Sequence, residues 1–211
     1  NIESKSSVKY LGVTLDQSLS FSDMATSILK KANAKLKFLY RKQNYLTPDT
    51  KKLLIMSLVQ CHFDYACSVW YNSLTKVFQN KFQTTQNKMI RFALDLDYNT
   101  HIDKQHFKYL GWLPVQKRVE QIIISQVFNI NNGSAPKYMN EHFKSQLSVH
   151  TYNTRFREKG AFAIPKVKSF GSKSFCFNGC TLWNKLPFSI TLIADYPGLK
   201  KALKSHLFDN I

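Results

Sequence analysis

The stretch "SSVKYLGVTLDQSLSFS", residues 6–22, carries the clearest strand signal in the chain. Every second residue in its centre is apolar: Leu11, Val13 and Leu15. This alternation predicts one β-strand, from Tyr10 to Asp16, with a buried face. A lone strand is not stable in water, because its apolar face needs at least two partner strands or a covering helix layer. The rest of the sequence should therefore supply those partners.

The composition is that of a folded and strongly basic protein. The 211 residues suffice for one good core or two small ones, and the 44% hydrophobic and 14% aromatic content excludes a disordered chain. The 30 Lys and Arg outnumber the 13 Asp and Glu, which gives a formal net charge of +17. Such an excess repels itself unless a polyanion lies nearby, and nucleic acid is the usual one.

No apolar run approaches the roughly 20 residues that a membrane span needs, and no signal-peptide pattern opens the chain. We therefore expect an intracellular protein without a membrane partner, in the nucleus or in a cytoplasmic ribonucleoprotein. The first residue is Asn1 rather than Met, which suggests a fragment or a processed product.

Four cysteines in apolar surroundings are expected to be small buried hydrophobes: Cys61, Cys67, Cys176 and Cys180. Zinc is the alternative, although their spacings are not those of the usual structural sites.

Residues 21–43 predict an amphipathic helix, with Ser22 as its N-cap. The expected buried stripe is Met24, Ile28, Ala32, Leu36 and Leu39. The opposite face and its flanks carry six cations: Lys30, Lys31, Lys35, Lys37, Arg41 and Lys42. A charge run is ordinarily a solvated face. Between Ile28 and Lys52, however, eight basic residues stand against one acid, so we expect this surface to face phosphates.

Further helices are predicted downstream. One begins with Thr47 as N-cap and Pro48 in its first turn, and is apolar on most sides. Another covers 75–94, with an apolar side of Phe78, Phe82, Met89 and Ala93. A short helix should end at Gly111 and a longer one at Gly133.

After Gly133 the sequence becomes less regular, and Pro165 interrupts the one stretch that resembles extended structure. Two short helices, 172–186 and 196–208, are expected to close the chain. Four cations here are candidate nucleic-acid contacts: Arg155, Arg157, Lys166 and Lys168. Nearby aromatic residues could stack on unpaired bases, although core packing is the commoner role: Tyr152, Phe156, Phe162 and Phe170.

No complete catalytic constellation is visible, so we expect no catalytic and no metal-binding residue. The loop "DLDYNTHIDKQH" resembles the start of a calcium loop, but Thr100 stands where the turn requires Gly, and His106 where a bidentate Glu is needed. A polar loop whose acidic residues satisfy backbone groups is the simpler interpretation.

Nine motifs in order resemble a known family: "VKYLGVTLDQSLSF", "ILKKANAKLKFLYR", "HFDYACSVWYNSL", "QNKMIRFAL", "HIDKQHFKYLGWLPVQKRV", "INNGSAPKYM", "YNTRF", "GCTLWNKLP" and "LKKALKSHLF". They are similar to the C-terminal part, thumb and post-thumb, of the reverse transcriptases encoded by non-LTR (LINE-type, jockey-like) retrotransposons. The resemblance covers essentially the whole chain. One departure is Met24-Ala25, where relatives commonly show His-Ile.

The resemblance implies that the N-terminal strand is the last strand of a catalytic palm and leads into a helical thumb that grips the template-primer duplex. No residue matches the family's catalytic Asp-Asp pair, so the chain alone should be inactive and hold no cofactor, the Mg²⁺ belonging to the parent polymerase. The implied partners are RNA template, DNA primer and the upstream palm of the same polypeptide.

We therefore expect a mainly α fold in three parts: a palm-remnant strand in 1–22, a helical thumb-like bundle in 23–132, and a basic, aromatic-rich, less regular module in 133–211. The expected function is that of a non-catalytic C-terminal piece of an RNA-directed DNA polymerase that grips template and primer. A stand-alone basic nucleic-acid-binding protein derived from a retroelement is the alternative. Binding of the first helix to a membrane surface is a third hypothesis.

Overall fold

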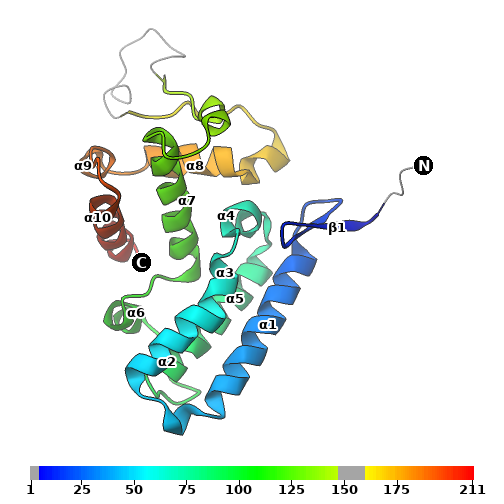
Figure 1. Ribbon diagram of the computed structural model, residues 1–211, viewed down its shortest axis with the longest axis vertical. Coiled ribbons are helices and arrows are strands. Elements are labelled where there is room, and N and C mark those ends of the chain that lie inside the picture. Colours follow the sequence, from blue (N-terminus) through cyan, green and yellow to red (C-terminus); the bar gives the residue numbers. More distant parts are fainter. Residues whose placement is uncertain (1–4, 147–159) are drawn as a thin grey trace. The chain divides into compact units, whose positions relative to one another are not determined.

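The chain is mainly helical with a short antiparallel sheet near the N-terminus, as predicted, in a computed structural model that describes residues 5–146 and 160–211 (Figure 1). It divides into two compact units between Gln116 and Lys117. This division places most of α7 (Val115–Asn131) in the second unit, whereas the sequence-based boundary assigns that helix to the bundle.

The N-terminal strand signal belongs to a hairpin. β1 (Ser7–Tyr10) pairs antiparallel with β2 (Val13–Asp16). Between them Leu11 and Gly12 have positive φ angles of 45° and 82°, as two-residue hairpin turns require. The expectation of one strand from Tyr10 to Asp16 was therefore wrong, because Leu11 and Gly12 form a turn between two paired strands. Leu11, assigned to the buried face, is 75% exposed, and Val13 is buried.

α1 (Ser22–Tyr40) follows the hairpin, and all five residues of its predicted apolar stripe are buried. The expected cap was wrong: the N-cap is Phe21, with a left-handed φ of 55° and no side-chain hydrogen bond. Asp16 compensates, since its carboxylate accepts the backbone N–H groups of Phe21 and Ser20 at 2.8 and 3.0 Å. The start of α1 is thereby tied to the end of β2.

The turn η1 (Gln43–Tyr45) leads to α2 (Pro48–Ile55). α2 begins as predicted, because the Thr47 hydroxyl accepts the Thr50 N–H at 3.3 Å. The helix continues through a π-helical turn, η2 (Met56–Gln60), into α3 (Cys61–Asp64). A left-handed residue, Ala66, then separates α3 from α4 (Cys67–Trp70) and the turn η3 (Tyr71–Ser73).

Contrary to the sequence-based expectation, Pro48–Ser73 is long and apolar enough to cross a membrane by length and composition alone. The mean hydropathy of its most apolar window is 1.2, and 39% of that window is buried inside the structure. Ile55, Val59 and Trp70 of this run are fully buried among protein side chains. A central helix of a bundle has the same composition, because its partners are other apolar side chains rather than lipid.

α5 (Lys76–Ala93) completes the core of the first unit. Of its predicted apolar side, Phe78 is half-buried, and the other three residues are buried. The Phe82 ring centroid lies 4.8 Å from that of Phe63 and 5.4 Å from that of Trp70. These contacts join α3, α4 and α5 around one aromatic cluster.

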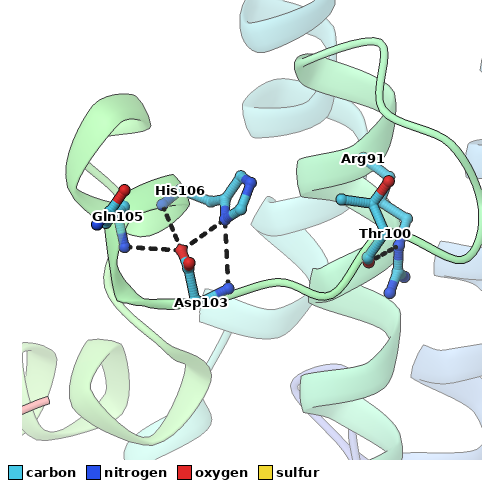
Figure 2. A network of polar contacts seen from close by, with 5 residues as sticks. All are labelled: Arg91, Thr100, Asp103, Gln105 and His106. Atoms are coloured by element: carbon cyan, nitrogen blue, oxygen red, sulfur yellow. Dashed lines mark hydrogen bonds and ion pairs between the residues drawn. The ribbon is translucent and has the colours of Figure 1, made fainter.

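The polar loop after α5 ends in α6 (Lys104–Leu110), whose start is a capping box (Figure 2). The Asp103 carboxylate accepts the backbone N–H groups of Gln105 and His106 at 3.0 and 3.3 Å. In return, the Nδ1 atom of the His106 ring accepts the backbone N–H of Asp103. The interpretation that acidic residues of this loop satisfy backbone groups is confirmed at Asp103. In residues 5–146 and 160–211, no group of three or more His, Cys, Asp or Glu could hold a metal ion.

The second unit contains α7, the turns η4 (Lys137–His142) and η6 (Ser169–Lys173), α8 (Phe175–Asn184), α9 (Phe188–Thr191) and α10 (Tyr196–Asp209). α8 and α10 confirm the two helices predicted to close the chain. Phe162 lies in the irregular segment before η6, and its backbone exchanges hydrogen bonds of 2.9 and 2.8 Å with the Asn184 amide. Phe162 is 4% exposed, so it belongs to the core, whereas Phe170 is 44% exposed; Tyr152 and Phe156 lie outside the described residues.

None of the four cysteines forms a disulfide bond. Cys67 and Cys180 are buried as predicted, Cys176 is half-buried, and Cys61 is exposed, which corrects the expectation for that residue. Burial, reinforced by the neighbouring Cys176, raises the pKa of the Cys180 thiol to about 11. Cys180 therefore stays protonated and packs as a small apolar side chain.

Candidate nucleic-acid interface

Three of the predicted phosphate contacts form an outer row on α1 and the residue after it. Lys30, Lys37 and Arg41 are exposed, and their spacing of seven and four residues puts them on the side opposite the buried stripe. The outer row is therefore available to a polyanion along about three turns of helix.

Lys31 and Lys35, here called the flank pair, lie on another side of α1, close enough to His62 to act on its charge. Burial first, and then the ammonium groups of Lys35 and Lys31, lower the pKa of His62. The His62 Nε2 atom is enclosed and has no hydrogen-bond partner among the described residues. The flank pair thus lies on the α3 side of α1, and Lys42 is exposed in the turn that follows the helix.

The remaining predicted contacts lie elsewhere in the sequence. Lys166 and Lys168 are exposed in the second unit, on the segment that leads to η6. Arg155 and Arg157 lie outside the described residues.

Lys51, counted with the basic segment in the sequence, is not a surface cation. It is 3% exposed and forms an ion pair with Asp95, and its ammonium lies 5.8 Å from the Phe92 ring centroid. The seven other basic residues between Ile28 and Lys52 carry the exposed or partly exposed charge of this segment.

A groove of about 340 Å³ runs between α1 and α5. Its polar lining comes from both helices: Thr26, Asn33, Lys81, Thr84, Thr85 and Lys88. The spacing of the outer row relative to Thr26 and Asn33 puts Lys30 and Lys37 along the same side of α1, at the rim. The Tyr40 hydroxyl donates to the Lys88 carbonyl at 3.0 Å, which fastens the end of α1 to α5. Both walls of the groove are therefore lined or bordered by lysines.

The two helices that form the groove contain one carboxylate between them, and it lies in the first turn of α1. α5 contains three Lys and one Arg and no acidic residue, and the single acid of α1 is Asp23 in its first turn. Lys81 and Lys88 are seven residues apart and so project from one side of α5. The sequence interpretation missed them, although a helix with four basic and no acidic residues was the available signal.

The groove presents cationic and neutral polar groups that can pair with anionic oxygens. Ammonium groups pair with phosphate oxygens as point charges, and Thr hydroxyls and Asn amides add neutral hydrogen bonds. The polar lining contains no carboxylate or imidazole that could act as a general acid or base. Contacts of this kind to a phosphate backbone position a nucleic acid without reading its sequence.

Comparisons with family models, with curated proteins and with solved structures found no match to this chain.

Proposed function

We propose that the chain is the non-catalytic thumb and post-thumb part of the reverse transcriptase of a non-LTR retrotransposon, an RNA-directed DNA polymerase, and that it grips template RNA and DNA primer. Support comes from the nine motifs in order and from the net charge of +17. The observation that carries the proposal is the α1–α5 groove, which Lys81 and Lys88 line from α5. By helical spacing, Lys30 and Lys37 lie along the same side of α1 as the groove residues Thr26 and Asn33.

Within this proposal, catalysis belongs to an upstream palm with its Mg²⁺, and the chain alone binds without polymerising. The β-hairpin would join that palm. The expected location is the nucleus or a cytoplasmic ribonucleoprotein, because both partners are nucleic acids.

The test is binding of a fluorescent RNA–DNA hybrid to the full chain, followed by anisotropy at several salt concentrations. Each lost phosphate contact should flatten the slope of log affinity against log salt by about 0.9. Lys81→Ala/Lys88→Ala should therefore flatten the slope by about 2. Lys30→Ala/Lys37→Ala should do the same.

The flank pair is the matched control, because Lys31→Ala/Lys35→Ala removes the same charge from the other side of α1. That variant should keep most of the slope. If all three double variants weaken binding equally, the cations act only through net charge, and the groove is not the binding surface.

A stand-alone nucleic-acid-binding protein is the second candidate. The observation that favours it is that β2 pairs with β1 of the same chain. An independent protein should unfold cooperatively and bind no hydrophobic dye, whereas a part that depends on an upstream palm should bind dye or aggregate. Membrane-surface binding by α1 has less support, since the apolar stripe of that helix is buried in the first unit.

A further inference from the structure

A second polar groove, of about 230 Å³, lies within the second unit between α7 and α10. From α7 it is lined by residues at helical spacing that include Gln121, Ser125 and Asn129, and from α10 by Tyr196 and Lys200. The Phe128 and Tyr196 ring centroids are 6.2 Å apart, and the Asn132 amide donates to the Ala194 carbonyl at 3.2 Å, so the two helices are held together beside the groove.

Gln121 is the unusual residue of this groove. It is 6% exposed and is the most buried of the side chains that line the groove. Two other glutamines are buried: Gln60 donates to Asp64 at 2.8 Å and Gln86 donates to the Leu113 carbonyl at 2.9 Å. An amide that lines a groove can donate and accept hydrogen bonds there, so Gln121 can bind a polar ligand in this groove.

Tyr196 and Lys200 provide two further kinds of contact on the α10 wall. Tyr196 is 41% exposed, while Phe128 supports its ring from within the unit. Lys200 follows four residues later and so lies on the same side of α10, exposed to solvent. The nearby acid, Asp195, is engaged as the N-cap, because its carboxylate accepts the Gly198 N–H at 2.6 Å.

We infer that the α7–α10 groove binds one unpaired nucleotide of a single-stranded RNA or DNA. The Tyr196 ring stacks on the base, the Gln121 amide hydrogen-bonds its edge, and the Lys200 ammonium pairs with its phosphate. Ligand pockets for whole drug-sized molecules occupy roughly 300 to 1,000 Å³, so this smaller groove suits one base with its phosphate at the mouth. The site reads unpaired bases, which the α1–α5 groove cannot do, and it does not depend on the proposed duplex grip.

The experiment uses the full chain and the fluorescent nucleotide 2-aminopurine riboside 5′-monophosphate, whose emission falls when its ring stacks on an aromatic side chain. Saturable quenching is expected, and Tyr196→Ala should abolish it. Gln121→Leu keeps the size of the side chain but removes the amide, and should weaken binding about three- to tenfold. Thermal unfolding of each variant verifies that it is folded.

Lys200→Ala should weaken binding and reduce its salt dependence, whereas the adjacent exposed Lys201→Ala is the charge-matched control and should leave both unchanged. Ribose 5-phosphate should compete poorly, because it lacks the base. Equal competition by ribose 5-phosphate, or an unchanged affinity in Gln121→Leu, would overturn the inference. Lys81→Ala/Lys88→Ala should not affect this binding, so failure of this site and failure of the α1–α5 groove are distinguishable.

Discussion

The Lys51 ammonium on α2 is ion-paired with the Asp95 carboxylate in the loop that follows α5. The lysine side chain is 4% exposed and the aspartate side chain 54% exposed, so one partner is enclosed and the other stands at the surface. This pair ties the beginning of α2 to the end of α5. A cation that the sequence groups with a phosphate-facing surface therefore serves the interior of the bundle.

Replacing Asp95 by Asn should lower the free energy of unfolding by about 2 to 3 kcal/mol, because the enclosed Lys51 loses its counter-charge. Asn tolerates the left-handed backbone at this position, where φ is 52°, so the change isolates the charge. Chemical denaturation measures the effect. The control is Asp97→Asn, an exposed site in the same loop that should change stability by less than about 0.5 kcal/mol; equal effects at both positions would contradict a specific pair.

Local patterns predicted the helices well where one face is buried. The apolar stripe of α1 and the Thr47 cap needed only helical spacing and capping chemistry. The hairpin was missed because alternation alone cannot distinguish a strand residue from a turn residue, although Gly12 was the available sign. Gln121 and Tyr196 could not be brought together from the sequence, since they lie on different helices and meet through packing contacts such as Phe128 against Tyr196.

Two threonines occupy equivalent N-cap positions and should respond differently to alanine. Thr47 and Thr75 have nearly the same backbone conformation, but only the Thr47 side chain accepts a helix N–H. Thr47→Ala should therefore destabilise the protein by about 1 kcal/mol. Thr75→Ala should cost clearly less, as measured by denaturant unfolding. If both changes have the same cost, the hydrogen bond at Thr47 contributes nothing measurable.

Gly179 on α8 is required by close packing. A Cβ atom built there would lie 2.9 Å from Val127 and 3.0 Å from the Phe143 ring. Gly179→Ala should destabilise by about 1 to 2 kcal/mol, because the clash exceeds the gain in helix propensity. Adding Val127→Ala makes room, so the double variant should be more stable than the sum of the two single effects. Strict additivity in this double-mutant cycle would show that the two positions do not touch.

Asp16 should make the free energy of unfolding depend on pH in the acidic range. Its hydrogen bond from the Ser18 hydroxyl, followed by those from the Ser20 and Phe21 N–H groups, lowers the pKa of the carboxyl well below its ordinary value of 3.8. Because the folded-state pKa is the lower one, the contribution is fully present above the unfolded value and is lost as the pH falls below about 4. Unfolding measured from about pH 6 down to pH 2 should therefore show a progressive loss.

Asp16→Asn should flatten that pH dependence, since it removes the titrating group while keeping an acceptor for the backbone of α1. Its stability at pH 6 should be lower than that of the parent, and the difference should shrink in acid as the parent carboxylate becomes protonated. Asp97→Asn is again the charge-matched control and should leave the acid profile nearly unchanged. A parent and an Asp16→Asn variant that lose stability in parallel below pH 4 would show that other carboxylates, and not the link between β2 and α1, govern acid unfolding.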